Sequence, residues 1–153
     1  MLTSLGKYGD FAPTVLRLML GLTLVFAHGL PKVVAPDRWE GTGRAMASIG
    51  ITFMPVFWGF MAGATELLAG ILFLIGLAVR PSAAVMVFVM FVAAAQSVMT
   101  RGTLGGGQAH PVDFAAGALA LMILGAGAYS LDRKLGLERP RAELKAPPRS
   151  IAV

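Results

Sequence analysis

The fold is decided by residues 55–79, which read PVFWGFMAGATELLAGILFLIGLAV. These 25 residues contain a single ionisable side chain, that of Glu66. A helix of roughly 20 apolar residues is long enough to cross the hydrocarbon core of a bilayer. Pro55 suits the first turn of such a helix, where a backbone N–H has no intrahelical partner in any case. The stretch therefore predicts a membrane-spanning helix with one costly carboxylate near its middle.

Three further apolar stretches flank this helix, one before it and two after it. The stretch at about 82–99 begins directly after Arg80-Pro81, so it forms a tight helical hairpin with 55–79. The other two cover about 13–34 and 111–129. We therefore expect an all-α, polytopic membrane protein, a four-transmembrane-helix bundle whose membrane domain covers residues 1–134.

Composition supports a membrane location. The 153 residues are 56% hydrophobic and 14% charged, whereas soluble domains carry about 25% charged residues. The absence of cysteine excludes a disulfide scaffold, a cysteine-ligated metal and thiol chemistry. Six of the thirteen Lys and Arg residues lie within residues 133–153, which is typical of a cytoplasmic flank and argues against nucleic-acid binding. We expect residues 135–153 to form a basic, proline-containing and disordered cytoplasmic tail.

The segment between the first two spans is amphipathic. Residues 36–50 combine Arg38, Glu40 and Arg44 with Trp39 and apolar side chains. Such a segment favours the membrane–water interface, where tryptophan lies at the level of the headgroups. Four spans place both termini on one side, and the excess of Lys and Arg there predicts that both termini are cytoplasmic.

Few polar side chains lie within the predicted spans, and each is a candidate functional residue because it is costly in lipid. Helical spacing places Arg17 and His28 on one face of the first span, and it places Glu66 on a glycine-lined face of the second. Small residues let helices approach closely, so Glu66 is expected to point into the bundle. The candidates for ligand binding or proton relay are Arg17, His28, Glu66, Gln96 and Asp113, and the candidate packing residues are Gly21, Gly59, Gly63, Gly70 and Gly117.

Each candidate has a second interpretation. We expect Arg17 to pair with Glu66 below a polar funnel, or else to extend toward the inner headgroups. Glu66 serves either a structural pair or a ligand, and His28 is either a hydrogen-bonded packing residue or a ligand. Gln96 is expected to be an interhelical hydrogen-bonding residue, and Asp113 suits the first turn of a helix in any case. No metal site is predicted, because the two histidines lack an H-x-x-x-H spacing.

Four strings in the sequence resemble the DoxX family. They are LRLMLG (residues 16–21), AHGLPK (27–32), ELLAGILFLIGL (66–77) and GAGAYSLDR (125–133). The resemblance implies a four-helix protein of the bacterial inner (plasma) membrane. It also implies a family in which some members are tied to quinone-linked oxidation of sulfur compounds, and others to membrane oxidoreductase complexes that handle oxidative stress.

The chain departs from the family pattern at two places. Its last string reads Gly-Ala-Gly where the family has Gly-Pro-Gly, and Gln96 and Ser97 occupy the region of an expected histidine. Without cysteine the chain cannot carry out dithiol exchange itself. A redox role therefore requires a bound quinone or a partner subunit.

Two functions of different classes follow. The first is a membrane subunit that binds a small apolar molecule, such as a quinone, for an oxidoreductase system. No intrinsic cofactor and no self-contained catalytic motif is evident, so the sequence leaves open whether the chain is an enzyme. The alternative is an accessory subunit of a larger complex that docks through exposed small residues such as Ala62, Ala69 and Gly76. Expected partners are the bilayer, oxidoreductase subunits or a second copy of the chain.

Overall fold

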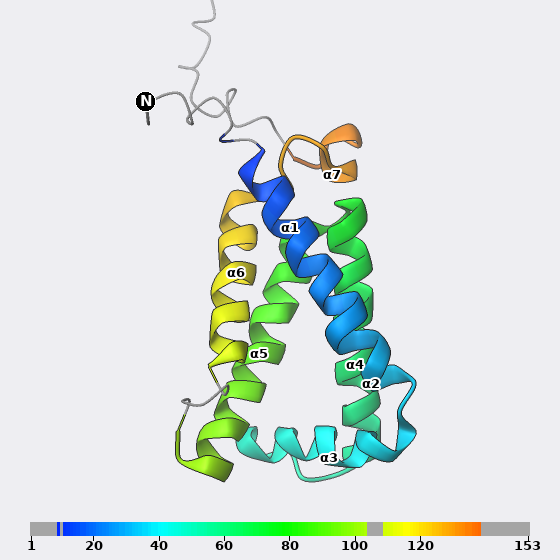
Figure 1. Ribbon diagram of the computed structural model, residues 1–153, viewed down its shortest axis with the longest axis vertical. Coiled ribbons are helices and arrows are strands. Elements are labelled where there is room, and N and C mark those ends of the chain that lie inside the picture. The colour runs from blue at the N-terminus through cyan, green and yellow to red at the C-terminus, as the bar shows by residue number, and fades with distance from the viewer. Residues whose placement is uncertain (1–8, 10, 104–108, 139–153) are drawn as a thin grey trace, which may run out of the picture.

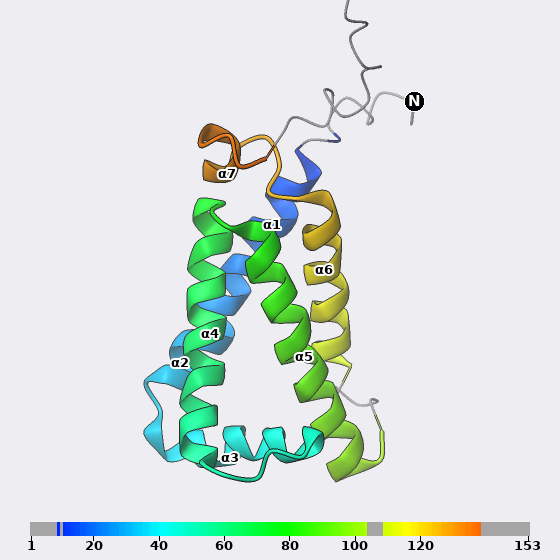
Figure 2. The same cartoon turned by 180° about the vertical axis from the view of Figure 1, so that it is seen from behind.

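The computed structural model describes residues 9, 11–103 and 109–138, and within these ranges the chain is helical and contains no strand. The long helices run side by side, with short helical turns at both ends (Figures 1 and 2). The first column comprises α1 (Ala12–Leu22), the π-helical turn η2 (Thr23–Gly29) and α2 (Leu30–Val33), and the other long helices are α4 (Pro55–Ile75), α5 (Val79–Arg101) and α6 (His110–Leu124).

The two ends of the bundle are closed by different elements. One end carries η3 (Pro36–Arg38), α3 (Trp39–Gly43) and η4 (Arg44–Ile49), and the opposite end carries α7 (Leu131–Lys134). We call these the α3 end and the α7 end. The helical turns of the α3 end fall within the segment predicted to be amphipathic. Of the tail expected to be disordered, 135–153, residues 135–138 are described, and Glu138 forms an ion pair with Arg80 at 3.0 Å. Residues 139–153 and residues 104–108 of the last loop lie outside the described residues.

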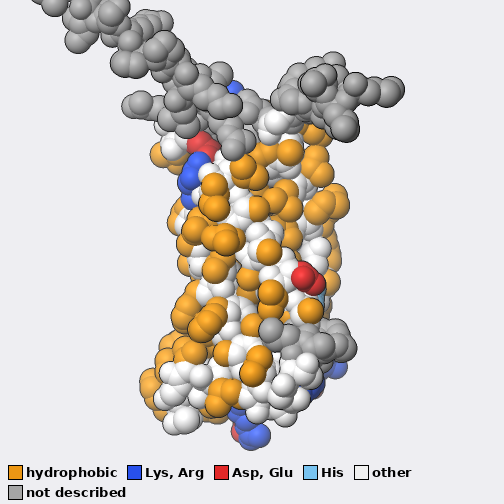
Figure 3. Space-filling model, turned by 90° about the vertical axis from the view of Figure 1, so that its left-hand side faces the viewer, with side chains coloured by type: hydrophobic (Ala, Val, Ile, Leu, Met, Phe, Trp, Pro, Cys, Tyr) orange, Lys and Arg blue, Asp and Glu red, His pale blue; other side chains and the backbone are white. Residues whose placement is uncertain are grey.

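In the part of the chain that the structure describes, three helices are long and apolar enough to cross a membrane, namely 12–33, 55–75 and 79–101. The fourth predicted span, 111–129, is shorter than expected. Its helix ends at Leu124 because Gly125 adopts a φ of +83°, which takes the chain out of the helix. On the face shown in Figure 3, hydrophobic side chains cover most of the middle, and charged groups gather mainly toward the two ends. This face thus has the surface of a membrane-embedded helical protein.

A π-helical turn lies directly before Pro31 in the first column. Here the N–H of Leu30 donates to the carbonyl of Val25, five residues earlier. In a regular α-helix the proline ring clashes with the carbonyl four residues before it. The wider turn relieves this clash, so the column continues through Pro31 and carries Lys32 one turn beyond His28.

Small residues hold the columns close together. A Cβ added to Gly21 would lie 3.0 Å from the carbonyl oxygen of Gly70, and one added to Gly70 would lie 2.8 Å from the Cβ of Leu24. The approaches at Gly21 and Gly70 need residues without a side chain. A Cβ added to Gly117 of α6 would lie 3.2 Å from a methyl carbon of Leu20 of α1, which is a looser contact. Around these contacts lies the core, whose largest fully buried side chains include Leu24, Phe73, Met86 and Leu121.

Substitution of Gly59 by alanine is expected to lower the thermal unfolding midpoint in mild detergent. A Cβ at Gly59 would collide with the carbonyl oxygen of Trp39, so α3 would have to move, at a cost of about 1–3 kcal/mol. Gly41 provides a matched control in α3, because a Cβ there meets nothing within 4 Å. Gly41→Ala should leave the midpoint unchanged or raise it slightly. Equal midpoints for the two variants would contradict the close packing of α3 on α4.

Candidate functional site

Glu66 forms an ion pair with Lys32. The two carboxylate oxygens lie 2.6 and 2.7 Å from Lys32 Nζ. The side chain of Glu66 is 3% exposed and that of Lys32 is 33% exposed. A carboxylate buried in a membrane-spanning helix needs such a partner. The predicted pair of Arg17 with Glu66 is therefore wrong, because Lys32 takes the position assigned to Arg17.

Three contacts position Lys32. The indole N–H of Trp39 donates to the Lys32 carbonyl oxygen at 2.8 Å, and Trp39 packs edge-on against Phe60 at a ring distance of 4.9 Å. A Cβ on Gly63 would lie 2.9 Å from the Cβ of Lys32, so the absence of a side chain at Gly63 lets the lysine stem lie against α4. Sequence reasoning missed Lys32 as a site residue. The available signal was its position four residues after His28, on the same helical stripe.

A cavity of about 260 Å³ lies beside this ion pair, between α4 and α5. These two helices separate toward the α3 end, where α3 and η4 bridge them (Figure 2). Lys32 and Glu66 supply the charged groups of the cavity wall. The remaining wall is mostly apolar and includes Met46, Met61, Val85, Phe88 and Val92.

Two hydrogen-bond donors of the cavity wall have capacity for a ligand. The Lys32 ammonium carries three N–H groups, of which the two Glu66 oxygens use at most two. The buried indole N–H of Trp58 has no acceptor among the described residues. A buried donor without an acceptor costs about 1–3 kcal/mol, and a ligand oxygen that reached it would remove that cost. The cavity therefore fits a molecule with an apolar body and acceptor oxygens.

Arg17 lies at the other end of the bundle and clamps backbone carbonyls. Its guanidinium donates to Phe73 at 2.6 Å, to Leu74 and Ala126 at 2.9 Å each, and also to Tyr129. The residue is 3% exposed, so it does not extend toward headgroups. Phe73 and Leu74 belong to the last turn of α4, where the carbonyls carry the negative end of the helix dipole. The Phe73 carbonyl also accepts from the backbone N–H of Gly76 at 3.2 Å. Arg17 is thus a structural clamp away from the cavity.

Asp132 complements this clamp at the start of α5. Its carboxylate accepts from the N–H groups of Ala78 at 2.7 Å and Val79 at 2.9 Å, and its own N–H donates to the Gly76 carbonyl at 2.9 Å. A carboxylate at a helix N-terminus satisfies unpaired N–H groups and the positive end of the dipole. Ser130 also accepts from the N–H of Arg133, as expected for the cap of α7. Residues 126–132, which lead into α7, therefore hold the ends of α1, α4 and α5 together.

His28 meets His110 across the bundle. Their Nε2 atoms lie 3.0 Å apart, and the ring of Phe114 packs edge-on against both imidazoles. One imidazole must donate and the other accept, which links the π-helical turn to the start of α6. This arrangement matches the hydrogen-bonded packing interpretation of His28. Among the described residues no group of three or more His, Asp or Glu is placed to hold a metal ion.

The remaining candidates do not line the cavity. Gln96 is half-buried on α5, and Asp113 is exposed in the first turn of α6. The proposed docking stripe is also not available on the surface. Ala69 is 4% exposed, Gly76 is buried against Ser130 and Arg17, and Ala62 lines the cavity. The expectation that this stripe is exposed is therefore wrong.

Long apolar helices, a buried ion pair and a cavity between spanning helices define the class as an all-helical integral membrane protein. The DoxX family model matches residues 12–99, more than half of the chain, and the chain belongs to the DoxX family. The match ends within α5, so α6 and α7 lie beyond it. No curated protein and no solved structure matches the chain.

Proposed function

We propose that this protein is a membrane subunit that binds a quinone-like molecule in the cavity beside Lys32 and Glu66, for an oxidoreductase system. The observation that carries the proposal is a paired ammonium group at the wall of a largely apolar cavity between two spanning helices. Quinone rings combine an apolar body with carbonyl oxygens, which accept hydrogen bonds. Binding pockets for small molecules have this combination of apolar walls and a few placed polar groups.

The residues would act on such a ligand in distinct ways. Lys32 would donate its remaining N–H to a carbonyl oxygen, and Glu66 would hold the ammonium in place. Met46, Met61 and Phe88 would contact the ring, since methionine adapts to irregular apolar shapes. The chain has no cysteine to carry electrons, so electrons would come from a partner oxidoreductase subunit.

The proposed topology has four membrane crossings, with α6 as the fourth. At 15 residues α6 extends about 22 Å, less than the roughly 30 Å of a hydrocarbon core. It runs alongside α5 in both ribbon views (Figures 1 and 2), which supports the assignment. We further propose a bacterial inner-membrane location with the α7 end facing the cytoplasm, on the basis of the basic residues near both termini.

Quinone binding is expected to raise the thermal unfolding midpoint of the purified protein in mild detergent, because a ligand stabilises the folded state that binds it. Ala62→Leu, which places a larger side chain in the cavity wall, should abolish this increase. Ala116→Leu makes the same change on the exposed face of α6, and this variant should keep the quinone-induced increase of the midpoint.

No stabilisation by ubiquinone or menaquinone, together with a stable partner found by mass spectrometry of the purified complex, would refute the proposal. That result would instead favour the accessory role. Two of the three residues in the stripe that supported this role, Ala69 and Gly76, are buried, and Ala62 lines the cavity, which supports ligand binding over docking through this stripe.

A further inference from the structure

We infer that the ligand enters the cavity sideways from the bilayer, and hence that it is a membrane-dissolved amphiphile whose ring head enters while its apolar tail stays among the acyl chains. This inference rests on the proposed function and specifies its substrate class. It follows from which sides of the cavity are closed, which side is open, and how much the cavity can hold.

The end of the cavity nearest the α3 end is covered. Thr42 and Gly43 of α3 and Ala45 and Met46 of η4 all line it. Gly43 approaches α4 so closely that an added Cβ would collide with the Pro55 carbonyl oxygen. The segment 39–49 therefore lies tightly over the cavity, and a ligand from water would have to displace it.

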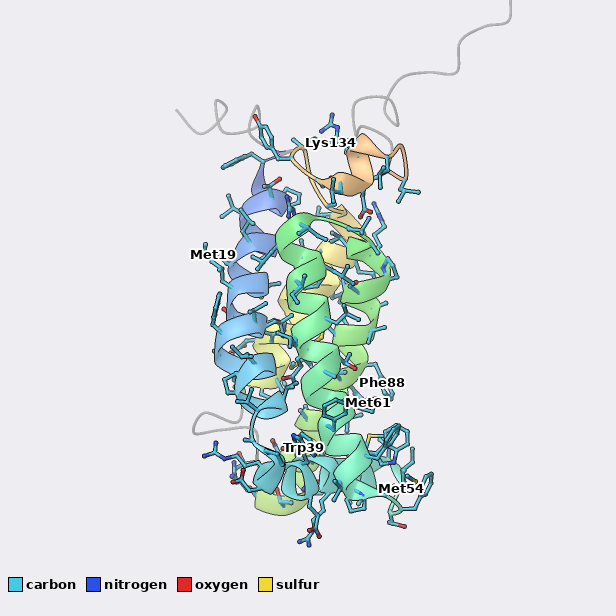
Figure 4. The ribbon with its side chains drawn as sticks, turned by 90° about the vertical axis from the view of Figure 1, so that its right-hand side faces the viewer. Met19, Trp39, Met54, Met61, Phe88 and Lys134 are labelled. Atoms are coloured by element: carbon cyan, nitrogen blue, oxygen red, sulfur yellow. The ribbon has the colours of Figure 1, made fainter. Side chains whose placement is uncertain are left out.

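The lateral side is open. Val85 and Phe88 line the cavity and are also 47% and 53% exposed on the outside of the molecule. Both lie within α5, one of the helices long and apolar enough to cross a membrane. Figure 4 shows Phe88 of α5 near Met61 of α4, on the side where these two helices border the cavity. A molecule dissolved in the bilayer meets this opening directly.

The volume limits what can enter. At about 260 Å³ the cavity is below the range of roughly 300–1,000 Å³ that encloses drug-sized ligands. A ring head fits, but a long tail does not. Acceptor oxygens on the head would meet the free N–H of Lys32, while the tail would leave past Val85 and Phe88.

Tryptophan fluorescence in nanodiscs tests this route, because the chain has two tryptophans and Trp58 lines the cavity. A quinone with an isoprenoid tail should quench the emission, and Trp58→Phe should remove most of the effect. Val85→Phe narrows the opening and should slow the quenching at least tenfold. Val112→Phe makes the same substitution at a site on α6 that is 42% exposed. Its emission should be quenched as fast as that of the unmodified protein.

The same measurement with a tailless quinone, at equal concentration per lipid, separates the possible outcomes. Equally fast quenching by both quinones, unaffected by Val85→Phe, would overturn lateral entry and leave the proposed function standing. No quenching and no thermal stabilisation by either quinone would overturn the proposed function itself. A phospholipid that co-purifies with the protein and that quinone does not displace, detected by mass spectrometry, would show that a phospholipid occupies the cavity, and would overturn the assigned ligand class.

Discussion

Replacing Arg17 with leucine is expected to lower the unfolding free energy by at least about 3 kcal/mol, and to reduce the yield of monodisperse protein in mild detergent. The variant keeps an apolar side chain in the first column but leaves the carbonyls of Leu74, Ala126 and Tyr129 without the donor that Arg17 supplies, and it removes one of the two donors to the Phe73 carbonyl. Each buried polar group left without a partner costs about 1–3 kcal/mol. Thermal unfolding followed by circular dichroism, together with size-exclusion chromatography, measures the loss.

Two variants control for charge and for geometry. Lys134→Gln removes a positive charge at the same end from a side chain that points away from the bundle (Figure 4), and it should change the midpoint little. Arg17→Lys keeps the charge but has three donors in place of five. Its unfolding midpoint should therefore lie between those of Arg17→Leu and Lys134→Gln. An Arg17→Leu protein as stable as the Lys134→Gln protein would show that Arg17 does not clamp the helix ends.

The long helices were predictable from sequence because their signals are local. Apolar length and an initial proline predicted a helix over 55–79, of which 55–75 is helical as α4, and the glycines around Glu66 correctly direct its carboxylate away from lipid. The fourth helix was placed five residues too long because Ala126, Ala128 and Tyr129 are as apolar as a helix interior, whereas the backbone leaves the helix at Gly125.

The partners of the buried charges were not predictable in the same way. Arg17 binds backbone carbonyls of α4 and of the segment before α7, and no residue type marks a carbonyl acceptor. A pairing rule based on opposite charges therefore assigned Arg17 to Glu66. Lys32 was not named as a candidate although it lies inside the predicted span 13–34, near its end, and the π-helical turn lets the column continue through it.

Removing Lys32 and Glu66 separately and together is expected to separate stability from ligand binding. Lys32→Met leaves a 3% exposed carboxylate without its cation and should cost about 3–5 kcal/mol. Glu66→Gln should cost less, because the Lys32 side chain is 33% exposed and can turn toward water or headgroups. The double variant Lys32→Met/Glu66→Leu should recover most of the loss, since an apolar pair of similar volume often replaces a buried ion pair without a stability penalty.

The effect on ligand binding should not parallel the effect on stability in the unmodified protein, the two single variants and the double variant. Because Lys32 supplies the donor and Glu66 holds it in place, Glu66→Gln should keep a smaller quinone-induced rise in the unfolding midpoint, while Lys32→Met and the double variant should lose it. The double variant is decisive, since it is expected to be stable and yet unable to bind. If it bound quinone as well as the unmodified protein, the ion pair would serve only to hold α2 against α4, and the ligand would have to be recognised by the apolar walls alone.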